Sequence, residues 1–219
     1  MRELRRVLVA IAMSMAALLS SGPAAAATLY QIDIIVFGRP GGGHAEQSVT
    51  GSGLAYPLRL ALLQTAPADA SSVGPWQLLP ASARALNDEA AALSRRGFPI
   101  LFQGAWRQPV DTATRATSVA LAGGRSVGAH HELAGYVTLS AENYLHLHVN
   151  LWLSQFGPNP PAGDTITLPV PGGAFEQPSD PPAIEKLFVL RQHRRLRSGE
   201  LHYFDHPRFS ALVTVRPIE

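Results

Sequence analysis

Alternation of apolar and polar side chains with a period of two is the feature that most constrains the fold of this chain. The alternation is clearest over residues 132–140 and 144–154, which are separated by only three residues. Because successive side chains of a strand point to opposite faces, these segments predict an antiparallel β-hairpin. In the second arm one face is aliphatic, and the other carries Tyr144, His146, His148, Asn150 and Trp152. We expect the aliphatic face in the core and the aromatic, polar face at the surface.

The same pattern recurs along the chain and predicts further strands. They are expected at residues 29–37, 99–107, 113–121, 187–196 and 209–216. Since most of these segments can pair as neighbours, the predicted fold class is α+β: a mainly antiparallel sheet of about six strands with one principal helix packed on one face.

The principal helix is expected at residues 82–96. Leu86, Ala90 and Leu93 fall on one helical face, Ser82 can cap the first turn, and Gly97 follows the last turn. Because this helix lies between two predicted strands, a crossover connection between them is expected. Residues 54–63 allow at most a second, short helix.

Glycine-rich and proline-rich segments interrupt the pattern at two places. Residues 38–53 and 157–182 have no hydrophobic period, and the second is dominated by proline. Proline and glycine weaken strands and helices, so both segments are predicted to be long loops. We interpret residues 28–219 as a single domain that carries these two insertions.

Residues 1–27 resemble a secretory signal peptide. A basic start is followed by an apolar run over residues 7–19 and by small residues that end in four alanines. The apolar run is short for a membrane span, and an uncleaved anchor is the alternative. Cleavage predicts a periplasmic protein without a stable membrane span.

Charge and cysteine content exclude several classes of function. Residues 1–27 contain three arginines and one glutamate, so the remaining chain carries equal numbers of basic and acidic residues. The slight positive charge of the whole chain therefore gives no ground for a nucleic-acid partner. The absence of cysteine excludes disulfides, thiol catalysis and a lipid-modified cysteine.

Several motifs of catalytic classes are absent: the chain lacks SxxK, HExxH and a glycine-rich phosphate loop. We therefore expect neither enzyme activity nor a cofactor. The alternative is a zinc-dependent periplasmic hydrolase. His146 and His148 point to the same side of a strand, and His193, His202 or His206 would supply a third ligand.

A local basic patch remains at residues 191–197. On an extended segment Arg191, Arg195 and Arg197 share one face with His193, and Arg194 lies on the opposite face. Three guanidinium groups on one face can bind carboxylates of a polymer or a partner protein. The alternative is edge-strand charges that only prevent aggregation. Together with the polar face of the hairpin, the candidate ligand-binding residues are Tyr144, His146, His148, Trp152, Arg191, His193, Arg195 and Arg197.

Residues 197–207 are predicted to form a compact turn region before the last strand. Asp205 and Pro207 are typical of turns, where the carboxylate accepts from nearby amides and the proline restricts the backbone. A structural role is expected for Ser198, Gly199, Glu200, His202, Tyr203, Phe204, Asp205, His206 and Pro207.

This C-terminal segment, Leu196 to Pro207 followed by Phe209, resembles the signature of the CsiV family of periplasmic peptidoglycan-binding proteins. Three further segments resemble the family in the same order: Tyr30 to Phe37, the WRQP sequence at Trp106 to Pro109, and Tyr144 to Trp152.

The resemblance implies a non-catalytic protein that binds peptidoglycan and supports a class A penicillin-binding protein, with that synthase's outer-membrane lipoprotein activator as a further partner. A protein-protein adaptor that does not touch the wall is the alternative. The resemblance assigns no ligand residues, so the candidates above rest on their chemistry.

Overall fold

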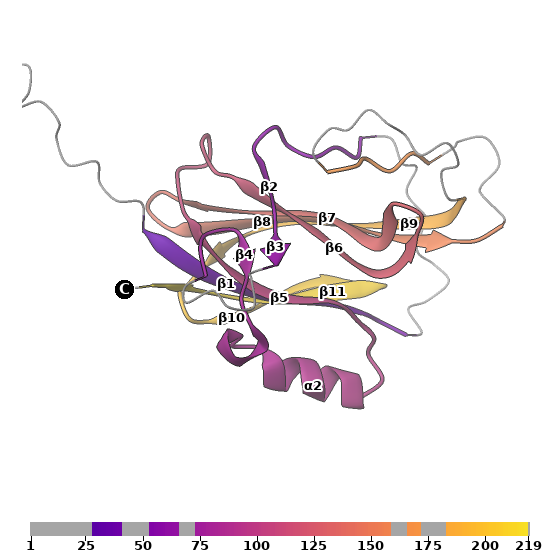
Figure 1. Ribbon diagram of the computed structural model, residues 1–219, viewed down its shortest axis with the longest axis horizontal. Coiled ribbons are helices and arrows are strands. Elements are labelled where there is room, and N and C mark those ends of the chain that lie inside the picture. The colour runs from indigo at the N-terminus through magenta and orange to yellow at the C-terminus, as the bar shows by residue number, and fades with distance from the viewer. Residues whose placement is uncertain (1–27, 41–52, 66–72, 159–165, 172–182, 219) are drawn as a thin grey trace, which may run out of the picture.

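The computed structural model describes residues 28–40, 53–65, 73–158, 166–171 and 183–218. In these ranges the chain is mostly β-structure, arranged as two sheets with one α-helix (Figure 1). No helix among the described residues is long and apolar enough to cross a membrane. The predicted signal peptide and most of the two predicted loops lie outside these ranges.

Two sheets replace the single sheet that the sequence predicted. Sheet A has the strand order β10-β11-β1-β5-β4-β3, and sheet B has the order β2-β6-β7-β8-β9. The strands of sheet A are β1 (Leu29–Gly38), β3 (Gln64–Thr65), β4 (Gln77–Leu78), β5 (Ile100–Pro109), β10 (Leu201–His206) and β11 (Phe209–Pro217). Those of sheet B are β2 (Leu60–Leu62), β6 (Ser118–Val127), β7 (His130–Ala141), β8 (Leu145–Phe156) and β9 (Ile184–Leu196).

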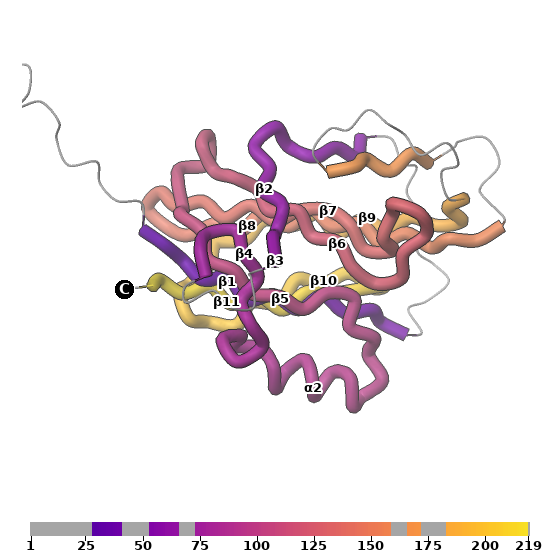
Figure 2. The backbone as a smooth tube through the Cα atoms, in the orientation of Figure 1, coloured from indigo at the N-terminus to yellow at the C-terminus, as the bar shows by residue number. Residues whose placement is uncertain are grey.

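The main hydrophobic core lies between the two sheets (Figure 2). Each sheet turns one face of its alternating strands inward, with Ile32 and Ile34 from β1 and Leu147 and Leu151 from β8 almost wholly buried. A fully buried aliphatic side chain contributes about 1.5–3 kcal/mol, so this shared layer holds the two sheets together. The aliphatic face of β8 lies in the core as expected, but the opposite face is at the surface only in its first part, because Asn150 and Trp152 are buried.

Helix α2 (Asn87–Arg95) packs on the outer face of sheet A, the face turned away from sheet B (Figure 1). Leu86 and Ala90 are buried against Ile35 and Phe37 of β1. The predicted helix was correct in its apolar stripe but began too early. Residues Ala81–Ala83 form a 3-10 turn, and the residue before the first turn of α2 is Leu86, without a side-chain cap.

A buried carboxylate explains the late start of α2. Asp33 of β1 is 1% exposed, and its Oδ1 accepts a hydrogen bond from the Ala85 amide at 2.7 Å. Gln31 donates to both Asp33 and the Ala83 carbonyl, each at 3.0 Å. These tertiary contacts hold residues 83–85 in a conformation that is not α-helical, and they override the local preference for an α-helix.

Three other predictions are corrected by strand pairing. β1 and β5 are antiparallel neighbours, with Ile34 opposite Gly104, so no parallel crossover joins them. The short helix proposed for residues 54–63 is absent from the described part of that segment, where β2 pairs with β6 instead. Strand β6 begins at Ser118 and continues through Gly123 and Gly124 with an irregular register. It therefore starts later than the strand predicted at residues 113–121 and extends beyond its predicted end.

The predicted turn at residues 197–207 also contains a strand. β10 forms a tight hairpin with β11, and His206 pairs directly with Phe209. Phe204 points into the main core and is wholly buried. Side chains of β10 alternate between more buried and more exposed positions around Phe204, as in a strand. The charged and turn-forming residues of the segment hide this alternation in the sequence.

Candidate functional site

The outer face of sheet B brings together the two groups of polar residues that were predicted separately. In the register of β8 and β9, His146 lies opposite Arg195, His148 opposite His193, and Asn150 opposite Arg191. Leu147, Val149 and Leu151, at the alternate positions of β8, are buried in the core between the sheets, so these side chains project away from sheet A. We call His146, His148, Arg191, His193 and Arg195 the cationic strip.

The three histidines of the cationic strip lie in one stack. His146 Nδ1 and His193 Nε2 are 3.0 Å apart, and the rings of His148 and His193 are stacked with centroids 4.0 Å apart. One nitrogen of the His146–His193 pair must donate while the other accepts, so that bond requires at least one neutral ring. Burial, followed by the proximity of His193 and His146, lowers the pKa of His148.

The arginines of the strip have no anionic partner. Among the described residues the ion pairs are Arg39–Asp205, Arg115–Asp111 and Arg197–Glu200, none of which involves the strip. Arg195 instead lies over the Tyr144 ring, 3.3 Å from its centroid. Tyr144 is 51% exposed, so this cation–π pair presents both a charge and an aromatic surface to solvent.

A pocket of about 430 Å³ opens at the Arg191 end of the strip. Its lining residues are Gly53, Ala55, Tyr136, His148, Val149, Asn150, Arg191, Gln192 and His193. Asn150 donates through Nδ2 to the Tyr136 hydroxyl at 2.9 Å, whereas its buried Oδ1 has no partner. The accessible donors of the pocket are those of Arg191 and its histidines, a combination suited to a ligand with carboxylate groups.

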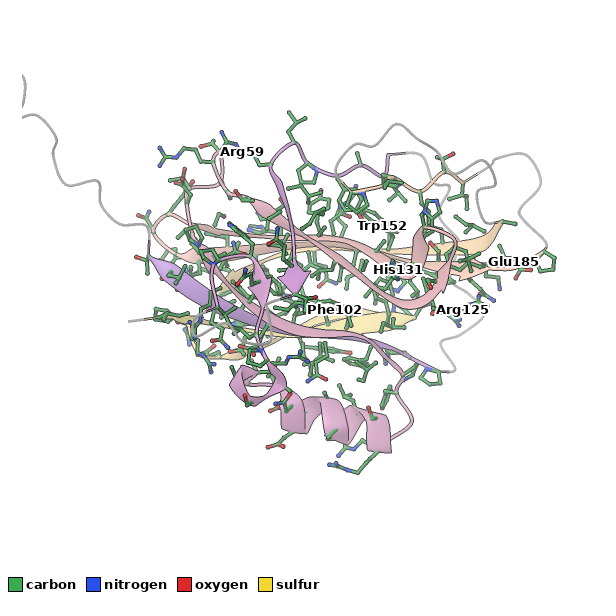
Figure 3. The ribbon with its side chains drawn as sticks, viewed as in Figure 1. Arg59, Phe102, Arg125, His131, Trp152 and Glu185 are labelled. Atoms are coloured by element: carbon green, nitrogen blue, oxygen red, sulfur yellow. The ribbon has the colours of Figure 1, made fainter. Side chains whose placement is uncertain are left out.

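Trp152 does not belong to the accessible site. It shares the outer face of sheet B with the strip, as predicted, but it is 0% exposed. Tyr56 covers it at a ring-centroid distance of 5.2 Å, and Ile166 and Leu168 pack in the same cluster. Figure 3 labels Trp152 on the side of sheet B that faces away from sheet A. Burial raises the pKa of Tyr56 to about 12, which keeps its hydroxyl neutral. The expectation that Trp152 contacts a ligand is therefore wrong.

Arg197 also lies apart from the strip. It follows the last residue of β9, and its guanidinium is 3.5 Å from Glu200. The Arg197 carbonyl lies 3.2 Å from Nε2 of His202 across the same turn. Gly199 has a left-handed backbone with φ of 79°, which favours glycine, and its amide donates to the Val215 carbonyl. Ser198 donates to that carbonyl as well, at 3.3 Å.

The rest of the C-terminal signature is engaged in contacts inside the hairpin. Asp205 Oδ1 accepts from Tyr203 at 2.8 Å, Ser210 at 2.9 Å and Arg39 at 2.7 Å. Burial alone would raise the pKa of Asp205, but hydrogen bonds from Tyr203 and Ser210 and the Arg39 guanidinium outweigh it and hold the pKa below its ordinary value. We call these four residues the hairpin network.

His206 and Pro207 lie at the closed end of the same hairpin. The His206 ring packs on Phe209 with a centroid distance of 5.1 Å, and its Nδ1 accepts from the Arg208 amide at 3.2 Å. These contacts are local to the fold, and they support the structural role expected of the signature.

Where the structure describes the chain, its histidines are divided between the two sheets. The described residues contain no group of three histidine, cysteine, aspartate or glutamate residues that could hold a metal ion. His202 and His206 belong to β10 of sheet A, whereas His146 and His148 belong to sheet B. His193 does join them, but its Nε2 is directed to His146.

Sequence reasoning missed several residues that line cavities. Tyr136 could have been found, because it occupies an alternate position of the predicted hairpin opposite Asn150. Gly53 and Ala55 carry no sequence signal, since they come from a segment far from the strip in the chain. A second pocket of about 240 Å³ includes Tyr56 and His130, and burial lowers the pKa of His130.

Comparison with known proteins identifies the family. A family model described as peptidoglycan-binding protein, CsiV, matches residues 8–218. No curated protein and no solved structure matches the chain. The match extends over nearly the whole sequence, including every strand of both sheets. The chain therefore belongs to the CsiV family of peptidoglycan-binding proteins.

Proposed function

We propose that this protein binds peptidoglycan through the cationic strip and that it acts as a non-catalytic protein of the periplasm. The observation that carries the proposal is the pair of arginines, Arg191 and Arg195, which lie on a regular sheet face and form no ion pair with any residue that the structure describes. Such charges remain available for a ligand, whereas the hairpin network satisfies its own charges internally.

The chemistry of the strip suits a polymer of amino sugars and short peptides. Guanidinium groups form paired hydrogen bonds to carboxylates, which the peptides of the wall supply. The exposed ring of Tyr144 offers an apolar face at which a sugar ring can pack. Because β9 is the edge strand of sheet B, a long ligand can approach it without crossing another strand.

The proposal extends to a supporting role in wall synthesis. The resemblance of the C-terminal signature supports a link to a class A penicillin-binding protein and to its outer-membrane lipoprotein activator. Residues 1–27, with the pattern of a signal peptide, support a periplasmic location. The competing proposal is an adaptor that reaches the wall only through such a partner. In that case the protein should sediment with purified cell-wall sacculi only when the partner is added.

Co-sedimentation with purified sacculi tests the proposal. The mature protein should pellet with sacculi, and Arg191→Ala combined with Arg195→Ala should weaken this binding by about tenfold, since each arginine can make charge-assisted hydrogen bonds. The supernatant should contain no released wall fragments if the protein is non-catalytic.

A matched control removes two positive charges elsewhere. Arg95 and Arg96 are exposed at the end of α2, on the opposite side of the molecule from the strip. Arg95→Ala combined with Arg96→Ala should leave sedimentation within about twofold of the parent, because it changes net charge without touching the site. Equal losses in both double variants would mean that binding follows net charge, and the site assignment would then be wrong.

A further inference from the structure

The spacing of charges along β9 suits a ligand with more than one carboxylate. Arg191, His193 and Arg195 occupy alternate positions on one face, so their Cα atoms are about 7 Å apart in succession. The two guanidinium groups therefore flank the histidine stack. A flexible peptide with two acidic groups can reach from one arginine to the other across His193.

The histidine stack lies between two fixed positive charges. A proton on His193 would put a further cation between Arg191 and Arg195 and against the stacked ring of His148. A proton on His146 as well would remove the acceptor from the 3.0 Å contact between Nδ1 and Nε2. Burial, and then the proximity of His193 and His146, lowers the pKa of His148, and a bound carboxylate acts in the opposite direction.

Among the described residues, no carboxylate is paired with the stack. Tyr136 of β7 lines the same pocket as His148 and His193, and Tyr144 lies under Arg195. Glu142, in the turn before β8, forms no ion pair among the described residues. Asp111, which bridges to Ser140 of β7, is held by Arg115 at 2.8 Å. A bound ligand can therefore supply a negative charge that the described part of the chain does not place at the stack.

We propose that the cationic strip recognises free carboxylates of the wall peptides and that binding draws a proton onto the histidine stack, so that the affinity rises as the pH falls from neutral. This inference rests on the proposed function, because it names the part of peptidoglycan that the strip binds. Arg191 and Arg195 supply the permanent charge, and the stack supplies a charge that depends on pH.

The test compares two preparations of sacculi at two pH values. In one preparation the free carboxylates are converted to neutral carboxamides with carbodiimide and ammonia, which leaves the glycan unchanged. We expect the parent protein to bind untreated sacculi about tenfold more tightly than amidated sacculi at pH 7.5. Binding to untreated sacculi should be about threefold to tenfold tighter at pH 5.5, since one proton taken up changes affinity by at most about tenfold per pH unit.

Two variants assign the pH dependence to the stack. His193→Gln keeps a hydrogen-bonding side chain without titrating, so binding should change less than about twofold between the two pH values. His148→Gln should flatten the profile partly and serves if His193→Gln fails to fold, as judged by circular dichroism. His131→Gln is the matched control, because His131 is an exposed histidine at the start of β7, outside the strip. It should retain the full pH dependence.

The outcomes separate this inference from the function on which it rests. Equal binding to untreated and amidated sacculi would overturn the recognition of carboxylates, but the proposal that the protein binds the wall would stand. A pH profile unchanged in both His193→Gln and His148→Gln would overturn the role of the stack. Absence of sedimentation with either preparation would overturn the proposed function, and the inference with it.

Discussion

The cationic strip and the hairpin network both take residues from the C-terminal part of the chain, but their charged groups differ in whether they are paired within the protein. In the hairpin network a single oxygen of Asp205 accepts from Tyr203, Ser210 and Arg39. In the cationic strip, Arg191 and Arg195 have no ion pair with any described residue. Polar groups that are hydrogen-bonded within the protein therefore stabilise the fold, whereas unpaired ones on a regular strand are available for a ligand.

The two regions are connected through the inner face of β9. Gln192 donates to the Asp205 carbonyl at 2.7 Å, and the Arg194 guanidinium lies 5.4 Å from the centroid of the Phe204 ring. Residues on one face of β9 thus contact the β10–β11 hairpin, while residues on the other face form the strip. The hairpin supports the strand that presents the site, although its own side chains do not reach that face.

The strongest way to break this division is to empty the core beneath the hairpin. Phe204→Ala should lower the free energy of unfolding by about 3–5 kcal/mol, because it removes a wholly buried ring from the core between the sheets. Urea denaturation measures the loss. The fraction that remains folded should still bind sacculi, and a variant of parental stability with lost binding would place Phe204 in the site instead.

A smaller effect is expected from the hairpin network. Asp205→Asn should lower the free energy of unfolding by at most about 1 kcal/mol, since Asp205 and Arg39 are both partly exposed. The depressed pKa of Asp205 means that its ionised form stabilises the fold above the unfolded value near 3.9 and that this contribution disappears as the pH falls through the lower folded pKa. The difference between the parent and Asp205→Asn should therefore shrink below about pH 4.

Denaturation curves at pH 7, 4 and 3 measure this difference. Sacculus binding at pH 7 should be unchanged in Asp205→Asn. Reduced binding at unchanged stability would show that the hairpin network contributes to the site, and the contrast with the strip would no longer hold.

The smallest effect sharpens the boundary of the strip. Arg197→Ala should change sacculus binding by less than about twofold and stability by less than about 1 kcal/mol, because Arg197 is exposed in a turn beside Glu200. Arg195→Ala changes a strip residue two positions earlier in the chain, and it should weaken binding severalfold. Equal losses in the two single variants would extend the strip around the end of β9.

Much of the secondary structure was predictable because strands carry a local signal. The strand at residues 29–37 and the hairpin arms at 132–140 and 144–154 correspond to β1, β7 and β8. The placement of Arg191, His193 and Arg195 on one face of a strand follows from the same period of two, and this prediction was also correct. Arg197 was not, since the strand ends at Leu196 and the period no longer applies.

Amino-acid order by itself determined which side chains share a face of each strand, because alternation is a property of a few neighbouring residues. The tertiary structure alone decided that the strands divide into two sheets, that β9 pairs with β8 to join the histidines with the arginines, and that Tyr56 covers Trp152. Each of these outcomes depends on contacts between residues far apart in the chain. Burial of one face against another sheet, rather than any local pattern, selects those partners.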